Sequence, residues 1–210
     1  MSRPPDGIAI STPGDWTELD LSALGDRKTV ESAVEARLAE APELAEHRDD
    51  LVDILERAAA SAARVEASFA AVLAADRDRG PMLANLTLVA QAVAADQPAD
   101  GLNAREGSSG KARGGAPAHS PQSEEALPPE VREVQLGAGT AGRQEELRTV
   151  GLTGSDSSLL FLIVRYLIPI PNTPDVEVLT FTSPTIAHRR ELVGLFHAIA
   201  DSVAFRWETD

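Results

Sequence analysis

The chain has 210 residues, of which 43% are hydrophobic, and this content is enough to fill one core. It carries 33 acidic and 19 basic residues, so its net charge of -14 repels phosphate backbones and acidic lipids and argues against nucleic acid as a partner. It has no cysteine, which excludes disulfides, thiolate metal sites, cysteine nucleophiles and lipid anchoring through a cysteine.

The amino-terminal stretch MSRPPDGIAISTPGDW lacks an apolar run of signal-peptide length, so we expect a cytoplasmic protein. A short strand is predicted over 16–21. Two helical patterns follow over 29–40 and 43–62, and Pro42 marks the boundary between them. We interpret their many acidic side chains as a solvated helix face, and a docking surface for a partner is the alternative.

The segment 63–93 is open to two interpretations. Apolar residues continue at steps of three and four from the preceding helix, which allows one long helix to Ala75. Alternatively, 65–75 and 82–93 are two strands joined by the turn sequence DRDRGP. One side of the second strand then carries Leu83, Asn85, Thr87 and Val89. We favour this hairpin because ANLTLVAQAV needs a strand partner nearby.

Between 96 and 128 the composition shifts to glycine, serine, alanine, proline and mixed charge, with hardly any large apolar residue. Such a segment cannot bury enough surface to offset the entropy of ordering, so we predict a disordered loop that interrupts one domain spanning 1–210. Its serines and the sequence KARGG suit a modification or docking site. An inert excursion between two strands is the simpler interpretation.

Two further strands are predicted over 131–136 and 146–150, joined by GAGTAG. Gly137, Gly139 and Gly142 match the G-x-G-x-x-G pattern, which cradles a pyrophosphate when it joins a buried strand to a helix. The preceding strand, EVREVQ, is too polar for a buried parallel strand, and the next strand follows too soon for a crossover helix. We therefore interpret the glycines as the tip of a hairpin.

The run LLFLIVRYLIPIP over 159–171 is the most hydrophobic part of the chain. The part before its prolines is too short to cross a bilayer as a helix, which needs about 20 apolar residues, and it contains Arg165. We therefore expect no membrane insertion. Its bulky and β-branched residues predict a strand. Because the run is apolar on both alternating faces, this strand should be central in a sheet and covered on both sides.

A hairpin is predicted after this strand, because the turn residues Asn172 to Asp175 lead into a second β-rich run over 176–182. If Ile170 faces Asp175, then Tyr166 lies beside Leu179 and Arg165 lies beside Thr180. The arginine is the anomaly in an otherwise apolar strand. The ordinary structural interpretation is that Arg165 lies at a margin of the sheet, with its stem packed and its charged end in water, or that it pairs with an internal carboxylate.

Ser183 and Pro184 predict the start of a closing helix over about 184–203, because a serine oxygen caps free N–H groups and proline suits the first helical position. One stripe of this helix carries Leu192, Phe196, Ile199 and Val203. The stripe should pack on the sheet.

The sequence shows no catalytic or metal-binding constellation. His188 and His197 are about two and a half helical turns apart and face opposite ways, so they cannot share a metal. His47 and Asp50 have a spacing that a metal can use, but on a charged helix we interpret them as solvated, and His119 falls in the predicted loop. No G-x-S-x-G elbow occurs. We therefore expect no catalytic residue, no cofactor and no metal.

The stretch VRYLIPIPNTPDVEVLTFTSPTIAHRRELVGLFHAIADSVAF, within 160–207, resembles the hairpin and closing helix of the PsbP-like α/β sandwich group, and the early PGDWTELDL resembles its opening strand. The group includes actinobacterial LpqN-type lipoproteins and Ran-binding transport factor relatives. The resemblance implies an α/β (α+β) fold in which an antiparallel β-sheet is flanked by helices as a sandwich. It also implies a non-enzymatic binding scaffold and carries over no active-site residue. The lipobox cysteine of the lipoprotein relatives has no counterpart in this chain.

Two functions are expected from these observations. The first is a non-catalytic adaptor that binds another protein, associated with a type VII secretion or cell-envelope system. The alanine-rich, lysine-poor composition resembles that of high-GC actinobacteria, where similar domains occur near such systems. The alternative is a small-molecule or anion site that uses Arg165, or an enzyme of unrecognised type. Homo-oligomerisation through an edge strand is a further structural option.

Overall fold

The computed structural model describes residues 3–23, 27–77, 80–92, 130–151 and 158–207. Within these ranges the strands, in chain order, are β1 (Gly7–Ala9), β2 (Trp16–Glu18), β3 (Phe69–Arg77), β4 (Gly80–Gln91), β5 (Val131–Leu136), β6 (Gly139–Gly151), β7 (Ser158–Pro169), β8 (Val176–Ser183) and β9 (Ala204–Arg206). The helices are α1 (Arg27–Glu40), α2 (Arg48–Arg64) and α3 (Arg189–Asp201), with short 3-10 helices η1 (Leu21–Ala23), η2 (Pro42–His47) and η4 (Ile186–His188). The predicted loop over 96–128 lies outside the described residues.

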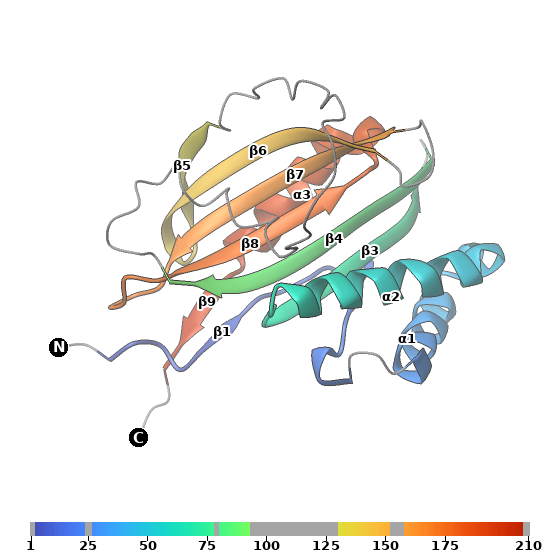
Figure 1. Ribbon diagram of the computed structural model, residues 1–210, viewed down its shortest axis with the longest axis horizontal. Helices are drawn as coiled ribbons and strands as arrows, with labels where there is room; N and C mark the ends of the chain where they lie inside the picture. Colours follow the sequence, from blue (N-terminus) through green and yellow to red (C-terminus); the bar gives the residue numbers. More distant parts are fainter. Residues whose placement is uncertain (1–2, 24–26, 78–79, 93–129, 152–157, 208–210) are drawn as a thin grey trace, which may run out of the picture.

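Seven of the strands form one antiparallel sheet in the order β2-β3-β4-β8-β7-β6-β5. Strands that follow one another in the chain pair directly, as in β3 with β4, β5 with β6 and β7 with β8. The pairing of β4 with β8 joins the two halves of the sheet. Helices flank this sheet, as Figure 1 shows, so the predicted fold class is confirmed.

Helix α3 covers one face of the sheet, which we call the α3-side face. Its predicted stripe is buried, and the ring of Phe196 stacks on that of Phe181 with 4.4 Å between centroids. Trp16 and Tyr166 meet Phe181 edge to face in the same cluster. These aromatic side chains belong to the apolar cluster that holds α3 against the strands, together with aliphatic residues of both.

The opposite face, called here the α2-side face, carries the two amino-terminal helices over only part of its width. Residues of α1, η2 and α2 pack with Val72 and Ala74 of β3 and with Leu83 of β4. Figure 1 shows both helices beside β3, away from β5 and β6. Strand β7 is interior in the sheet, between β8 and β6, as predicted. On the α3-side face it is buried, and on the other face its residues Arg165 and Leu167 line a hollow among the described residues.

The hairpin predictions agree with the observed pairing. The segment 63–93 contains the β3–β4 hairpin, with Val72 opposite Asn85, rather than one long helix. The GAGTAG glycines form the tip of the β5–β6 hairpin, where Leu136 pairs with Gly139. No helix follows them, so the nucleotide-binding context is absent at this hairpin.

The register predicted for the β7–β8 hairpin is confirmed. Tyr166 pairs with Leu179 and Arg165 with Thr180. The Ile170 N–H donates to the Asp175 carbonyl at 3.0 Å, which closes the predicted turn.

The start of the closing helix differs from the prediction. The α-helix begins at Arg189, after η4, and its first turn has no side-chain cap. The Ser183 hydroxyl accepts a hydrogen bond from the Thr185 N–H at 3.0 Å and donates one to the Leu83 carbonyl at 2.5 Å. The serine therefore ties the turn after β8 to β4, and the helix starts later than a capping serine implies.

The two ends of the chain pair with each other, which the sequence did not predict. Strand β1 runs antiparallel to β9, with Ile8 opposite Phe205. Both side chains pack against the cluster on the α3-side face, so the pair extends the cover of that face. No helix in the described part of the chain is long and apolar enough to cross a membrane.

Candidate ligand-binding site

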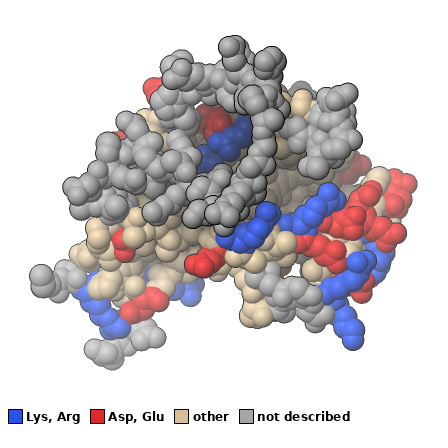
Figure 2. Space-filling view, in the orientation of Figure 1, with Lys and Arg blue, Asp and Glu red and all other residues tan. Residues whose placement is uncertain are grey.

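The part of the α2-side face that the described helices do not cover forms a hollow of about 410 Å³, which we call the Arg165 hollow. Its floor consists of side chains from the four neighbouring strands β4, β8, β7 and β6, and the end of α2 forms one wall. Figure 2 shows a group of acidic and basic side chains on this face.

Arg165 lies on the floor of this hollow. Its side chain is 16% exposed, and its strand neighbours are Gln144 on β6 and Thr180 on β8. The Nη1 atom is 3.6 Å from Glu146 Oε2, a diagonal neighbour on β6. Among the described residues this ion pair is its one polar side-chain contact, although a guanidinium has five N–H donors. The arginine therefore lies inside the sheet with donor capacity to spare.

The acid near Arg165 is held more closely by a different arginine. Arg148 Nε donates to Glu146 Oε1 at 2.8 Å, and Arg148 Nη2 donates to Glu146 Oε2 at 3.1 Å. This two-point contact fixes the carboxylate beside Arg148. Since Glu146 is shared, it neutralises only part of the charge of the two guanidiniums.

The described lining of the hollow is cationic, whereas the whole chain has a net charge of -14. Three guanidiniums line it, those of Arg64, Arg148 and Arg165, and no carboxylate does. Glu146 lies beside the lining and supplies one negative charge. A partly enclosed site of this sign attracts anions, because Coulomb interactions are stronger there than in open water.

Neutral polar side chains surround the guanidiniums. They belong to alternate positions of adjacent strands and to α2, and comprise Ser61, Asn85, Thr87, Gln91, Gln144, Thr180 and Thr182. Hydroxyls and amides donate and accept hydrogen bonds, so they suit a ligand with polar groups. Sequence reasoning did not identify them as a site. The available signal was a pair of polar residues two positions apart on β4 (Asn85 and Thr87) and another on β8 (Thr180 and Thr182), which is unusual for two interior strands.

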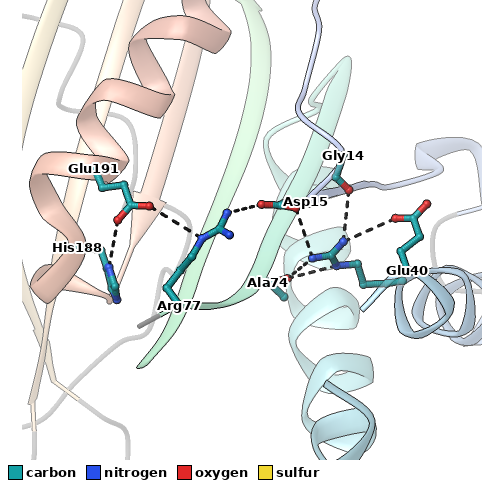
Figure 3. Close-up of polar contacts among 8 residues, drawn as sticks. Gly14, Asp15, Glu40, Ala74, Arg77, His188 and Glu191 are labelled. Atoms are coloured by element: carbon teal, nitrogen blue, oxygen red, sulfur yellow. Dashed lines mark hydrogen bonds and ion pairs between the residues drawn. The ribbon is translucent and has the colours of Figure 1, made fainter. Parts of the chain in front are cut away.

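A second, larger hollow of about 1060 Å³ lies beside η4, and three of its charged or titratable lining residues, Arg77, His188 and Glu191, contact one another. His188 Nδ1 is 3.4 Å from Glu191 Oε2, and Glu191 Oε1 is 3.9 Å from Arg77 Nε. Arg77 also pairs with Asp15. Figure 3 shows these side chains as a chain of contacts that leads on to α1. We interpret them as a structural link between α3, β3 and the turn before β2.

Arg37 ends that chain of contacts and is buried. Its Nη2 and Nε atoms donate to the Ala74 carbonyl at 2.9 and 3.3 Å, and its Nη1 atom donates to the Gly14 carbonyl at 3.4 Å. Glu40 lies 3.6 Å away from Nη1 (Figure 3). The residue therefore holds α1 against β3.

The histidines singled out in the sequence do not come together. His47 is exposed beside Glu46 and Asp50, His188 is buried beside Glu191, and the ring of His197 lies 6.1 Å from that of Tyr166. His119 is outside the described residues. Within the described residues there is no group of three or more histidines and acids that could hold a metal ion.

Comparison of the sequence with protein-family models and with curated proteins finds no match.

Proposed function

We propose that this protein is a non-catalytic binding domain whose Arg165 hollow receives an anionic group of a small ligand. The observation that carries the proposal is the position of Arg165, a guanidinium on the floor of an interior strand with one long ion pair among the described residues. A largely enclosed cation is costly without compensating partners, so a ligand that pairs with Arg165 would account for its place on an apolar strand.

The size of the hollow supports this proposal. Small-ligand sites commonly enclose about 300 to 1,000 Å³, and the Arg165 hollow encloses about 410 Å³. Arg148 and Arg64 add positive charge at its rim, while threonine and amide side chains supply directional hydrogen bonds. These features support binding of a ligand, and none of them calls for a chemical reaction at the site.

Titration with anions tests the proposal. The wild-type protein is titrated with inorganic phosphate and with small carboxylates, and binding is followed by thermal shift and calorimetry. Arg165→Met keeps an unbranched apolar stem but removes the guanidinium and its charge, and it should abolish binding. Arg132→Met is the matched control, because Arg132 is exposed on β5 and pairs with Glu130 outside the hollow. Equal binding by both variants would exclude Arg165 as the anion contact.

The second candidate function is binding of another protein, favoured by exposed apolar side chains at the ends of β6 and β7 farthest from the β5–β6 turn. Leu147 and Leu160 are exposed on the α3-side face, and the paired residues Val150 and Leu159 are exposed on the α2-side face. An exposed apolar surface such as the one that Val150 and Leu159 form is typical of protein contacts. A cytoplasmic adaptor of a secretion or cell-envelope system, as implied by the PsbP-like resemblance, would use such a surface.

Two measurements distinguish binding of a different protein from association of two copies of this chain. Affinity capture from native cells at physiological salt, with wild type and with Leu159→Asp, identifies a partner that depends on this surface. Light scattering of both proteins shows whether the surface instead joins two copies of the chain. An unchanged set of captured proteins together with a monomeric wild type would argue against a role for these residues.

A further inference from the structure

The floor of the Arg165 hollow is divided into rows of different polarity. Side chains in register on neighbouring strands lie about 5 Å apart and point to the same face. One row across the strands is formed by Thr87, Thr180, Arg165 and Gln144. This row is polar throughout and contains the guanidinium.

The next row toward the β7–β8 turn is apolar. Val89 pairs with Val178, and Val178 pairs with Leu167. All three line the hollow, and Gly142, the partner of Leu167 on β6, ends the row without a side chain. The two rows are two residues apart on each strand, which corresponds to about 7 Å. The hollow therefore has a cationic end and an apolar end within one small volume.

The side chains of the apolar row are only partly covered by the rest of the protein. Val178 is buried, but Val89 and Leu167 are half-buried, and no helix residue of the apolar cluster beneath α1 and α2 packs on them. Val65, at the carboxyl end of α2, also lines the hollow and is 37% exposed. Apolar surface that a ligand can cover contributes to affinity in proportion to the area removed from water.

From this juxtaposition we propose that the ligand is an amphipathic monocarboxylate, whose carboxylate pairs with Arg165 while its apolar group covers Val89, Leu167 and Val178. This inference rests on the proposed function of the hollow. A singly charged head is favoured over a dianion, because Glu146 lies 3.6 Å from Arg165 and repels added negative charge. A planar carboxylate also matches the fork of a guanidinium.

The length of the ligand follows from the distance between the rows. With its carboxylate at Arg165, the apolar group must reach about 7 Å along the strands to lie over Leu167 and Val178. An unbranched chain of the size of octanoate covers that distance, and acetate does not. Octanoate and acetate are therefore the matched probes, and 1-octanol is the probe with the tail but without the charge.

The test is an NMR titration of the full-length protein with acetate, octanoate, 1-octanol and inorganic phosphate. We expect octanoate to bind at least about tenfold more tightly than acetate, since burial of methylene groups adds affinity. Arg165→Met should abolish carboxylate binding. Val178→Thr, which conserves volume, should remove most of the preference for octanoate while leaving acetate binding unchanged. Val193→Thr on α3, which packs on the other face of the sheet, is the control and should change neither. Far-ultraviolet dichroism verifies that each variant is folded.

The outcomes separate this inference from the proposed function. If acetate, phosphate and octanoate bind equally and all depend on Arg165, the hollow is an anion site and the amphipathic assignment is overturned. If Arg165→Met binds octanol and octanoate equally well, and binds octanoate as tightly as the wild type does, then the proposed pairing of the carboxylate with Arg165 is overturned. If no anion binds to the folded wild type, both the inference and the proposed function are overturned.

Discussion

Arg165 Nη1 and Glu146 Oε2 lie 3.6 Å apart on adjacent strands, at the bottom of a hollow that no described helix covers. The carboxylate is already bound at two points by Arg148, so its contact with Arg165 is secondary. Glu146 therefore acts as an internal competitor of any anion that approaches Arg165. This relationship makes the charge of Glu146 a test of the hollow.

Replacement of Glu146 by glutamine should strengthen anion binding. Glu146→Gln removes one negative charge near Arg165 and Arg148, so we expect the dissociation constant for a monocarboxylate to fall about three- to tenfold at low salt. The free energy of unfolding should change by less than about 1 kcal/mol, because the ion pairs are partly exposed. Calorimetry and urea unfolding measure the two quantities.

Glu145→Gln is the matched control for this variant. Glu145 is the neighbouring residue on β6 but faces the other side of the sheet, where it pairs with Arg143 and Arg189. It should leave anion affinity unchanged. If both glutamine variants raised the affinity equally, the effect would reflect net charge and not the hollow.

Arg37 should be important for stability, because its guanidinium holds the buried Ala74 carbonyl. Arg37→Met leaves this acceptor without its donor, so we expect a loss of about 1–3 kcal/mol in the free energy of unfolding. Arg48→Met is the control, since Arg48 is exposed and pairs with Glu35, and it should cost clearly less stability than Arg37→Met. Urea unfolding compares the two variants, and equal losses would show that Arg37 does not anchor α1 to β3.

Glu177 should make the protein less stable as the pH rises. It is buried on β8, its Oε2 atom has no partner among the described residues, and burial raises the pKa of its carboxyl above 4.5. The folded state therefore prefers the protonated form. The stabilising contribution is fully present below the pKa of about 4.3 expected in the unfolded chain and is lost as the pH rises through the folded pKa.

Glu177→Gln should remove this dependence. Urea midpoints of wild type and variant are compared across acidic to neutral pH, and the advantage of the variant should grow toward neutral pH. Glu133→Gln, an exposed position on β5, is the control. A difference between wild type and Glu177→Gln that stays constant with pH would show that Glu177 does not titrate differently in the folded state.

The only tyrosine of the chain provides a direct test of the packing beneath α3. Burial raises the pKa of Tyr166 to about 12. A spectrophotometric titration should therefore show no tyrosinate near pH 10 in the folded protein, whereas the urea-unfolded chain titrates near about 10. Stability should decrease as the pH rises above 10, because the unfolded state then loses its proton first. Ionisation near pH 10 without unfolding would show that β7 is not buried by α3.

The β7–β8 hairpin was predictable because its signals are local. An apolar run, a turn of proline, asparagine and aspartate, and a second β-rich run fix the register, so Tyr166 and Leu179 could be paired from the sequence. The β3–β4 hairpin was chosen correctly for a similar reason. In both cases the partners are near in the chain.

Other features depend on contacts between distant segments. The pairing of Ile8 with Phe205 joins the two ends of the chain, and no local pattern announces it. In the described part of the chain, the extent of α1 and α2 over the sheet leaves Arg165 and Leu167 of β7 facing a hollow, which the apolar sequence of β7 does not reveal. The rows around Arg165 combine residues from four strands, so their polarity became visible only once the strand order was known.

The most direct test of the central claim is an amide NMR titration of the wild-type protein with octanoate, with Arg165→Met titrated in parallel. The binding account predicts that the perturbed amides cluster around Arg165, Gln144, Thr180 and Val178, and that the perturbations vanish in the variant. Perturbations confined to residues outside the Arg165 hollow, or unchanged binding by Arg165→Met, would contradict it.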